Sequence, residues 1–124
     1  MDGIKAVANA LGGCGVASVY AVPGYPITGL AEHLIAQVPD ARWVINEKSA
    51  FEMAFGRSVC GERTCVLVKH VGMNVLSDAL ITSATHTIGA GLVVMAGDDP
   101  LAVGSQNEQD SRYYGLISEL AVFD

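Results

Sequence analysis

The chain has 124 residues, of which 51% are hydrophobic and 16% are charged, and its formal net charge is −6. This length predicts one domain over residues 1–124, and the composition is that of a packed protein rather than a disordered one. An acidic chain lacks the basic surface that binds nucleic acids and anionic membranes, so neither is an expected partner. No apolar run is long enough to cross a bilayer and no signal-peptide pattern opens the chain, so we expect a cytoplasmic protein.

The cysteines form neither a disulfide framework nor a metal-binding pattern. Cys14, Cys60 and Cys65 are odd in number, and the last two lack the two-residue separation of a zinc knuckle. We therefore expect reduced thiols and no metal site in this chain.

The first element is expected to be a helix, because apolar residues recur at helical spacing from Ile4 to Leu11. A glycine-rich stretch over residues 12–15 follows it, and an apolar strand is expected over residues 16–22. A dinucleotide-binding fingerprint would instead lie after a strand and before a helix. The glycines are therefore interpreted as the end of the helix.

Beyond a turn at residues 23–26, helices and strands continue to alternate. Thr28 is a candidate N-cap for a helix that runs to about residue 38. Later strands are expected over residues 43–45, 65–68, 92–95 and 120–123, and later helices over residues 49–60 and 75–83. The inward faces of these two helices are expected to include Val59 and Val75. Residues 105–112 are polar and predict a loop.

The expected strands are continuous apolar runs separated by helices, which is typical of a parallel sheet covered on both faces. The fold class is therefore predicted as α/β, with a doubly wound and mainly parallel sheet. The chain stops at its last expected strand, where a further helix would ordinarily pack. We expect a partner chain or a second copy to cover the surface that this leaves exposed.

Polar residues gather where the expected strands end, which is where open α/β sheets bind ligands. Among them, Glu47 follows the strand over residues 43–45. A carboxylate in this position can share a proton with a ring nitrogen of a ligand. It can equally stabilise the start of the next helix through the helix dipole, and both interpretations are open at this point.

Several short motifs resemble the 2-oxoacid:ferredoxin oxidoreductases. Tyr25-Pro26-Ile27-Thr28 resembles the tyrosine-proline-x-threonine motif of that family. The stretches at residues 43–52, 69–74 and 98–100, and the longer block at residues 105–114, resemble its indolepyruvate branch. These blocks follow the order of the family and cover nearly the whole chain.

The resemblance implies the pyrimidine-binding (PYR) domain of a thiamine diphosphate-dependent enzyme that decarboxylates a 2-oxo acid. Glu47 matches the activating glutamate of the family, which hydrogen-bonds the pyrimidine ring of the cofactor. The resemblance assigns the remaining cofactor-binding positions to Gly24, Tyr25, Pro26, His70, Gly72 and Asn74. It assigns the substrate-binding positions to Thr28, Asn107 and Arg112.

Some of these residues also have structural interpretations. Thr28 can act as a helix cap instead of binding the substrate. Arg112 can form a surface ion pair with Asp110 or Glu108 instead of binding a substrate carboxylate. His70 and Asn74 can order their loop.

The chain departs from the family because it has no Gly-Asp-Gly signature for the diphosphate and no cysteine-rich iron–sulfur motif. We therefore expect a separate PP subunit to hold the diphosphate through Mg²⁺, a two-chain plan similar to that of sulfopyruvate decarboxylase. A homodimer or a dimer of heterodimers is expected. Oxidative, ferredoxin-linked decarboxylation and simple decarboxylation are both open. A non-catalytic binding or regulatory module that has kept the fold is the alternative.

Overall fold

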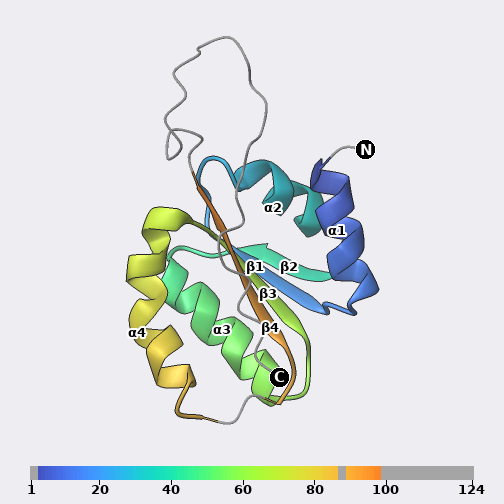
Figure 1. Ribbon diagram of the computed structural model, residues 1–124. Helices are drawn as coiled ribbons and strands as arrows, with labels where there is room; N and C mark the ends of the chain where they lie inside the picture. Colours follow the sequence, from blue (N-terminus) through green and yellow to red (C-terminus); the bar gives the residue numbers. More distant parts are fainter. Residues whose placement is uncertain (1–2, 87–88, 99–124) are drawn as a thin grey trace.

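The computed structural model describes residues 3–86 and 89–98, and Figure 1 shows its elements in chain order. The helices are α1 (Gly3–Gly13), α2 (Thr28–Ile35), α3 (Glu47–Val59) and α4 (Met73–Ser83), with a 3₁₀ turn, η1 (His70–Gly72), before α4. The strands are β1 (Ser18–Ala21), β2 (Asp40–Trp43), β3 (Thr64–Lys69) and β4 (Leu92–Gly97). The strand expected at residues 120–123 and the loop expected at residues 105–112 lie outside the described residues.

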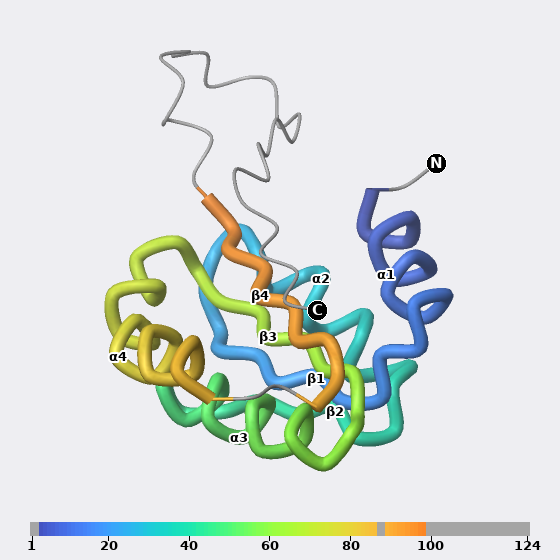
Figure 2. The backbone as a smooth tube through the Cα atoms, turned by 60° about the horizontal axis from the view of Figure 1, so that its bottom comes forward, coloured from blue at the N-terminus to red at the C-terminus, as the bar shows by residue number. Residues whose placement is uncertain are grey.

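The four strands form one parallel sheet in the order β2-β1-β3-β4. Helices α1 and α2 lie on one face of this sheet, and α3 and α4 lie on the other (Figures 1 and 2). This arrangement confirms the predicted doubly wound α/β fold. None of the described helices has both the length and the apolarity that a bilayer crossing requires.

The core consists of two apolar clusters, one on each face of the sheet. Alternate residues of β1 and β3 enter opposite clusters, so Val19 and Leu67 pack beneath α1 and α2 whereas Tyr20 and Val66 pack beneath α3 and α4. Every residue of β1 is buried, as is β3 up to Val68. Burial on both faces explains why these strands have continuous apolar sequences instead of alternating ones.

The helices that follow the two central strands leave the sheet in opposite directions. The chain passes from β1 to α2 on one face, and from β3 through η1 to α4 on the other. Because β1 and β3 are neighbours, a topological switch point lies between their carboxyl ends, and open α/β sheets commonly bind ligands at such points.

The prediction for the second strand was wrong by about three residues. The apolar run at residues 43–45 was expected to be the strand, but β2 comprises Asp40–Trp43 and pairs with β1 from Ser18↔Asp40 to Ala21↔Trp43. Within the described residues β2 pairs with β1 alone, and its residues are exposed or half-buried. Apolar character is therefore a poor guide to its position, and Ile45 is 93% exposed.

Two residues expected on inward helix faces point outward instead. Val59 is 53% exposed and Val75 is 48% exposed. Each lies directly beside a buried residue, Ser58 in α3 and Leu76 in α4, and adjacent helical positions differ by about 100° around the axis. The helices were predicted correctly, but their buried faces are narrower than expected.

Candidate functional site

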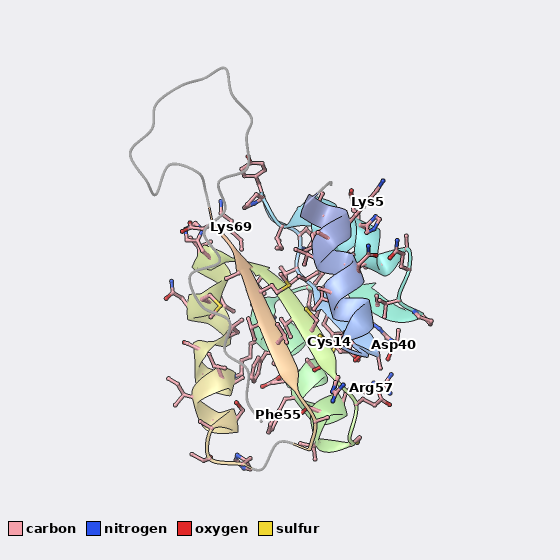
Figure 3. All side chains as sticks on the ribbon, turned by 45° about the vertical axis from the view of Figure 1, so that its right-hand side comes forward. Lys5, Cys14, Asp40, Phe55, Arg57 and Lys69 are labelled. Atoms are coloured by element: carbon pink, nitrogen blue, oxygen red, sulfur yellow. The ribbon has the colours of Figure 1, made fainter. Side chains whose placement is uncertain are left out.

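The segments that follow the four strands come together at one edge of the sheet, which we call the carboxyl edge. It consists of residues 22–28 after β1, 44–47 after β2, 70–72 after β3 and 98 after β4. Figure 3 marks its position by Lys69, at the end of β3. Most of the predicted site residues lie here, as expected for a parallel sheet.

Glu47 is the first residue of α3. The Asn46 side chain caps this helix by accepting a hydrogen bond of 2.8 Å from the backbone N–H of Ser49. Asn46 itself has extended backbone dihedrals, as a capping residue does. The first turn of α3 is thus fixed by its neighbour, and the carboxylate of Glu47 lies at the positive end of the helix dipole.

The side chain of Glu47 lies against Gly72, in the turn that follows β3. A Cβ atom at Gly72 would lie 2.4 Å from Glu47 Oε1, 2.6 Å from its Cγ and 2.7 Å from its Cδ. Gly72 is buried and Glu47 is half-buried. The carboxylate therefore occupies a notch that exists only because residue 72 has no side chain.

The turn after β1 is held against the ends of β3 and β4. A Cβ atom at Gly24 would lie 3.2 Å from Lys69 Cβ. One at Gly97 would lie 3.1 Å from Ile27 Cβ and 3.2 Å from Pro26 Cδ. The Tyr25–Pro26 peptide bond in this turn is cis, and Tyr25 is exposed. These close approaches fix the turn beside the exits of both strands.

The hydroxyl group of Thr28 closes the same turn. It donates a hydrogen bond of 2.9 Å to the Gly24 carbonyl oxygen and accepts one of 3.1 Å from the Gly24 N–H. The N-cap position of α2 is Ile27, which makes no side-chain capping bond. The expectation that Thr28 caps the helix was therefore wrong. The Thr28 hydroxyl group instead bonds to the N–H and the carbonyl oxygen of Gly24, and so satisfies both main-chain groups of that residue.

His70 and Asp98 connect the ends of β3 and β4. His70 Nδ1 lies 3.1 Å from Asp98 Oδ1, so the two groups form an ion pair whenever the imidazole is protonated. The ring nitrogen is buried but is not aligned for a hydrogen bond in the described part of the chain. Asn74, in the first turn of α4, is exposed.

The first turn of α3 and the second turn of α4 are also linked by charge. Lys48 forms a salt bridge with Asp78 of α4, and this hydrogen bond raises the pKa of Lys48 above its usual value. The cation next to Glu47 is thus paired with a different carboxylate. In the part of the chain that the structure describes, no group of three or more His, Cys, Asp or Glu side chains could hold a metal ion.

The curated proteins most similar to this chain include several with one name. This chain is 38% identical over 116 residues to "Indolepyruvate oxidoreductase subunit IorA" of Methanothermobacter thermautotrophicus, and the alignment covers 90% of this chain and 18% of the relative. The IorA proteins of Archaeoglobus fulgidus and Thermococcus kodakarensis are 36% and 34% identical, over 98% of this chain and 21% and 20% of their own lengths. This chain is a relative of IorA. No family model matches it.

The relationship to IorA confirms the resemblance to the indolepyruvate branch, and the chain spans about a fifth of the length of the IorA proteins that it matches. Among the predicted site residues, the structure brings seven to the carboxyl edge, namely Gly24, Tyr25, Pro26, Thr28, Glu47, His70 and Gly72. Asn107 and Arg112 lie outside the described residues.

Sequence reasoning missed two residues that shape this edge. Asn46 was not recognised as a helix cap, although an Asn directly before a periodic apolar face is a usual signal for one. Gly97 packs against Pro26 and Ile27, and no pattern in the sequence indicates that contact.

Proposed function

We propose that this chain is the pyrimidine-binding unit of a thiamine diphosphate-dependent oxidoreductase that acts on a 2-oxo acid, and that Glu47 is its activating residue. The observation that carries the proposal is the seating of the Glu47 side chain against Gly72, beside the switch point between β1 and β3. The IorA relatives support an oxidoreductase subunit in preference to a simple decarboxylase.

The residues at the carboxyl edge fit the pyrimidine half of this cofactor. A ring that carries nitrogen atoms can be held by a carboxylate through a hydrogen bond. Glu47 supplies that carboxylate, which lies against the backbone of Gly72. When bound, thiamine diphosphate supplies a nucleophilic carbon and an electron sink for the loss of CO₂.

The task of Glu47 is to hold a proton at a ring nitrogen of the cofactor. Its place at the start of α3 keeps the carboxylate on a rigid element, because Asn46 caps the helix. A positioned group of this kind contributes to catalysis through general acid–base chemistry.

Other residues complete the proposed site. Thr28 fixes the turn through Gly24 and borders the substrate, Arg112 binds the substrate carboxylate, and Asn107 is a further substrate-binding residue. Tyr25, Pro26, His70 and Asn74 enclose the ring. A PP subunit holds the diphosphate through Mg²⁺ and covers the carboxyl edge.

The test is Glu47→Gln in the complex of this chain with its PP partner. Glutamine preserves the size of the side chain but does not hold the proton as a carboxylate does. Turnover of the 2-oxo acid is measured as the rate of CO₂ release. We expect this rate to fall by about 100- to 10,000-fold while the circular dichroism spectrum is unchanged. Glu52→Gln, an exposed position on the same helix, is the matched control and should retain wild-type turnover. Wild-type turnover by Glu47→Gln would refute the proposed role.

A further inference from the structure

We infer that Gly72 is a positioning residue, because its missing side chain determines where the carboxylate of Glu47 rests. This inference depends on the proposed function for its consequence in catalysis, but not for the contact itself. Glu47 follows β2 and Gly72 follows β3, with β1 lying between those strands in the sheet. The contact therefore connects two strand exits that are not neighbours.

The geometry predicts that a methyl group at residue 72 would clash first with the side chain of Glu47. The three heavy atoms nearest to an added Cβ are Oε1, Cγ and Cδ of Glu47, all closer than 3.0 Å. Gly72 has φ −68° and ψ −17°, which alanine adopts without strain. The clash caused by Gly72→Ala is thus relieved by rotation of the Glu47 side chain rather than by movement of the backbone.

The other described glycines behave differently. An added Cβ at Gly97 would crowd Ile27 and Pro26, and one at Gly89 would meet two backbone oxygens at 2.6 and 2.8 Å. At Gly56, in the middle of α3, it would meet nothing within 4 Å. Among the glycines that the structure describes, Gly72 is the one whose nearest contacts belong to a carboxylate side chain.

The start of α3 cannot easily move away to accommodate a larger residue 72. Asn46 caps the helix, and α3 packs against α4. Phe51, one turn further on, is fully buried in the cluster beneath α3 and α4. With the backbone held on these sides, the Glu47 side chain must turn out of the notch. A displacement of about 1 Å at a reacting group can lower a rate by about 100-fold.

The contact is first measured in the full chain without cofactor. Nuclear magnetic resonance should show an Overhauser effect between Gly72 Hα and Glu47 Hγ in the wild type. In Gly72→Ala, the Glu47 Hγ resonances should shift. Gly56→Ala is the matched control on the same helix as Glu47 and should leave both signals unchanged. Absence of the Overhauser effect in the wild type would overturn the inference.

The consequence is measured in the complex with the PP partner, as a double-mutant cycle. We expect Gly72→Ala to lower turnover by about 10- to 100-fold in the presence of Glu47, and to have no further effect in a Glu47→Ala background. Equal losses in both backgrounds would mean that Gly72 acts independently of Glu47, and an unchanged turnover in Gly72→Ala would also overturn the inference. If Glu47→Gln itself keeps wild-type turnover, the proposed function fails, whereas the Overhauser measurement still decides the contact.

Discussion

Close approach of other segments requires glycine at both edges of the sheet, but only one edge of the described structure requires it for backbone conformation. At the carboxyl edge, Gly24, Gly72 and Gly97 have ordinary backbone dihedrals and are required by close approach of other segments. At the opposite edge, which we call the amino edge (residues 14–17, 57–63 and 89–91), Gly15 and Gly61 have φ +71° and +91°. Those two are required by backbone conformation, because a side chain is strained there.

The edges also differ in how their polar groups are satisfied. At the amino edge, Arg57 forms ion pairs with Asp40 and Glu62, and donates a hydrogen bond to the Tyr20 hydroxyl that raises the pKa of the guanidinium. Arg63 donates to the Cys14 carbonyl oxygen. Figure 3 shows Arg57 and Asp40 together, away from Lys69. The amino edge is a structural network, whereas the carboxyl edge leaves the large apolar side chains of Tyr25, Ile45 and Val71 exposed.

This difference indicates where substitutions should affect stability and where they should affect activity. Substitutions that damage the amino edge or the core should destabilise the fold. Those confined to the Glu47 notch should spare it. Five measurements test this separation, beginning with the core that joins both edges.

The largest effect is expected from ionisation of Cys65, which lies in β3 between the two edges. Burial raises the pKa of this thiol from 9.0 to about 12. The folded chain therefore holds the proton more tightly than the unfolded chain. The contribution of the protonated thiol to the free energy of unfolding is intact below about pH 9 and is lost as the pH rises towards 12. Urea unfolding at about pH 8 and about pH 11 measures it. Cys65→Ala should show a smaller loss between the two pH values than the wild type, and an equal loss would contradict the assignment.

A thiol reagent gives an independent check on the same residue. Cys14 and Cys60 are exposed, so they should be alkylated rapidly in the folded chain, whereas Cys65 should react only on unfolding. Rapid modification of all three would show that β3 is not protected.

Gly89→Ala should damage the amino edge. The added Cβ would lie 2.6 Å from the Ser58 carbonyl oxygen and 2.8 Å from that of Val59, and these main-chain atoms cannot rotate away. Overpacking of this kind costs about 1–3 kcal/mol of unfolding free energy. Gly91→Ala is the control, since nothing lies within 4 Å of an added Cβ there. Equal stability of the two variants would contradict the distinction between the glycines.

Thr28→Val should have a smaller effect. Valine keeps the shape of the side chain but removes both hydrogen bonds to Gly24. The free energy of unfolding should fall by about 1 kcal/mol, and Thr28→Ser should retain most of it. Thermal unfolding of the three proteins measures the difference. If serine and valine were equally destabilising, the hydroxyl would not be what closes the turn.

Asp78→Asn should leave the unfolding midpoint unchanged. The salt bridge with Lys48 is exposed, with 71% of the aspartate side chain accessible, and such pairs contribute little. A clear fall in the midpoint would show that this link holds α3 on α4.

Local patterns predicted most of the fold, because the central strands and the helices carry strong apolar periodicity. They failed for β2, since an edge strand is defined by its pairing with β1 and not by its own hydrophobicity. They failed for Thr28 because the competing partner, Gly24, became available only through the shape of the turn.

The placement of site residues at one edge of the sheet was predictable, but their contacts were not. The rule that parallel strands end at one edge placed Glu47, His70 and Gly72 together. The seating of Glu47 on Gly72 depends on β1 lying between β2 and β3, and that strand order is a property of tertiary packing. No spacing in the sequence reports a distance between two loops from different crossovers.

The strand order also determines when the site can appear during synthesis of the chain. β1 and β2 are consecutive and can pair early, but β1 keeps one side unpaired until β3 arrives. The β1–β3 pairing joins residues further apart in the sequence (Ser18↔Thr64) than the β1–β2 pairing does (Ser18↔Asp40), so its larger entropic cost delays it. Glu47 emerges before β3, and Gly72 emerges after it. A nascent chain that stops before β3 therefore carries the carboxylate without its notch.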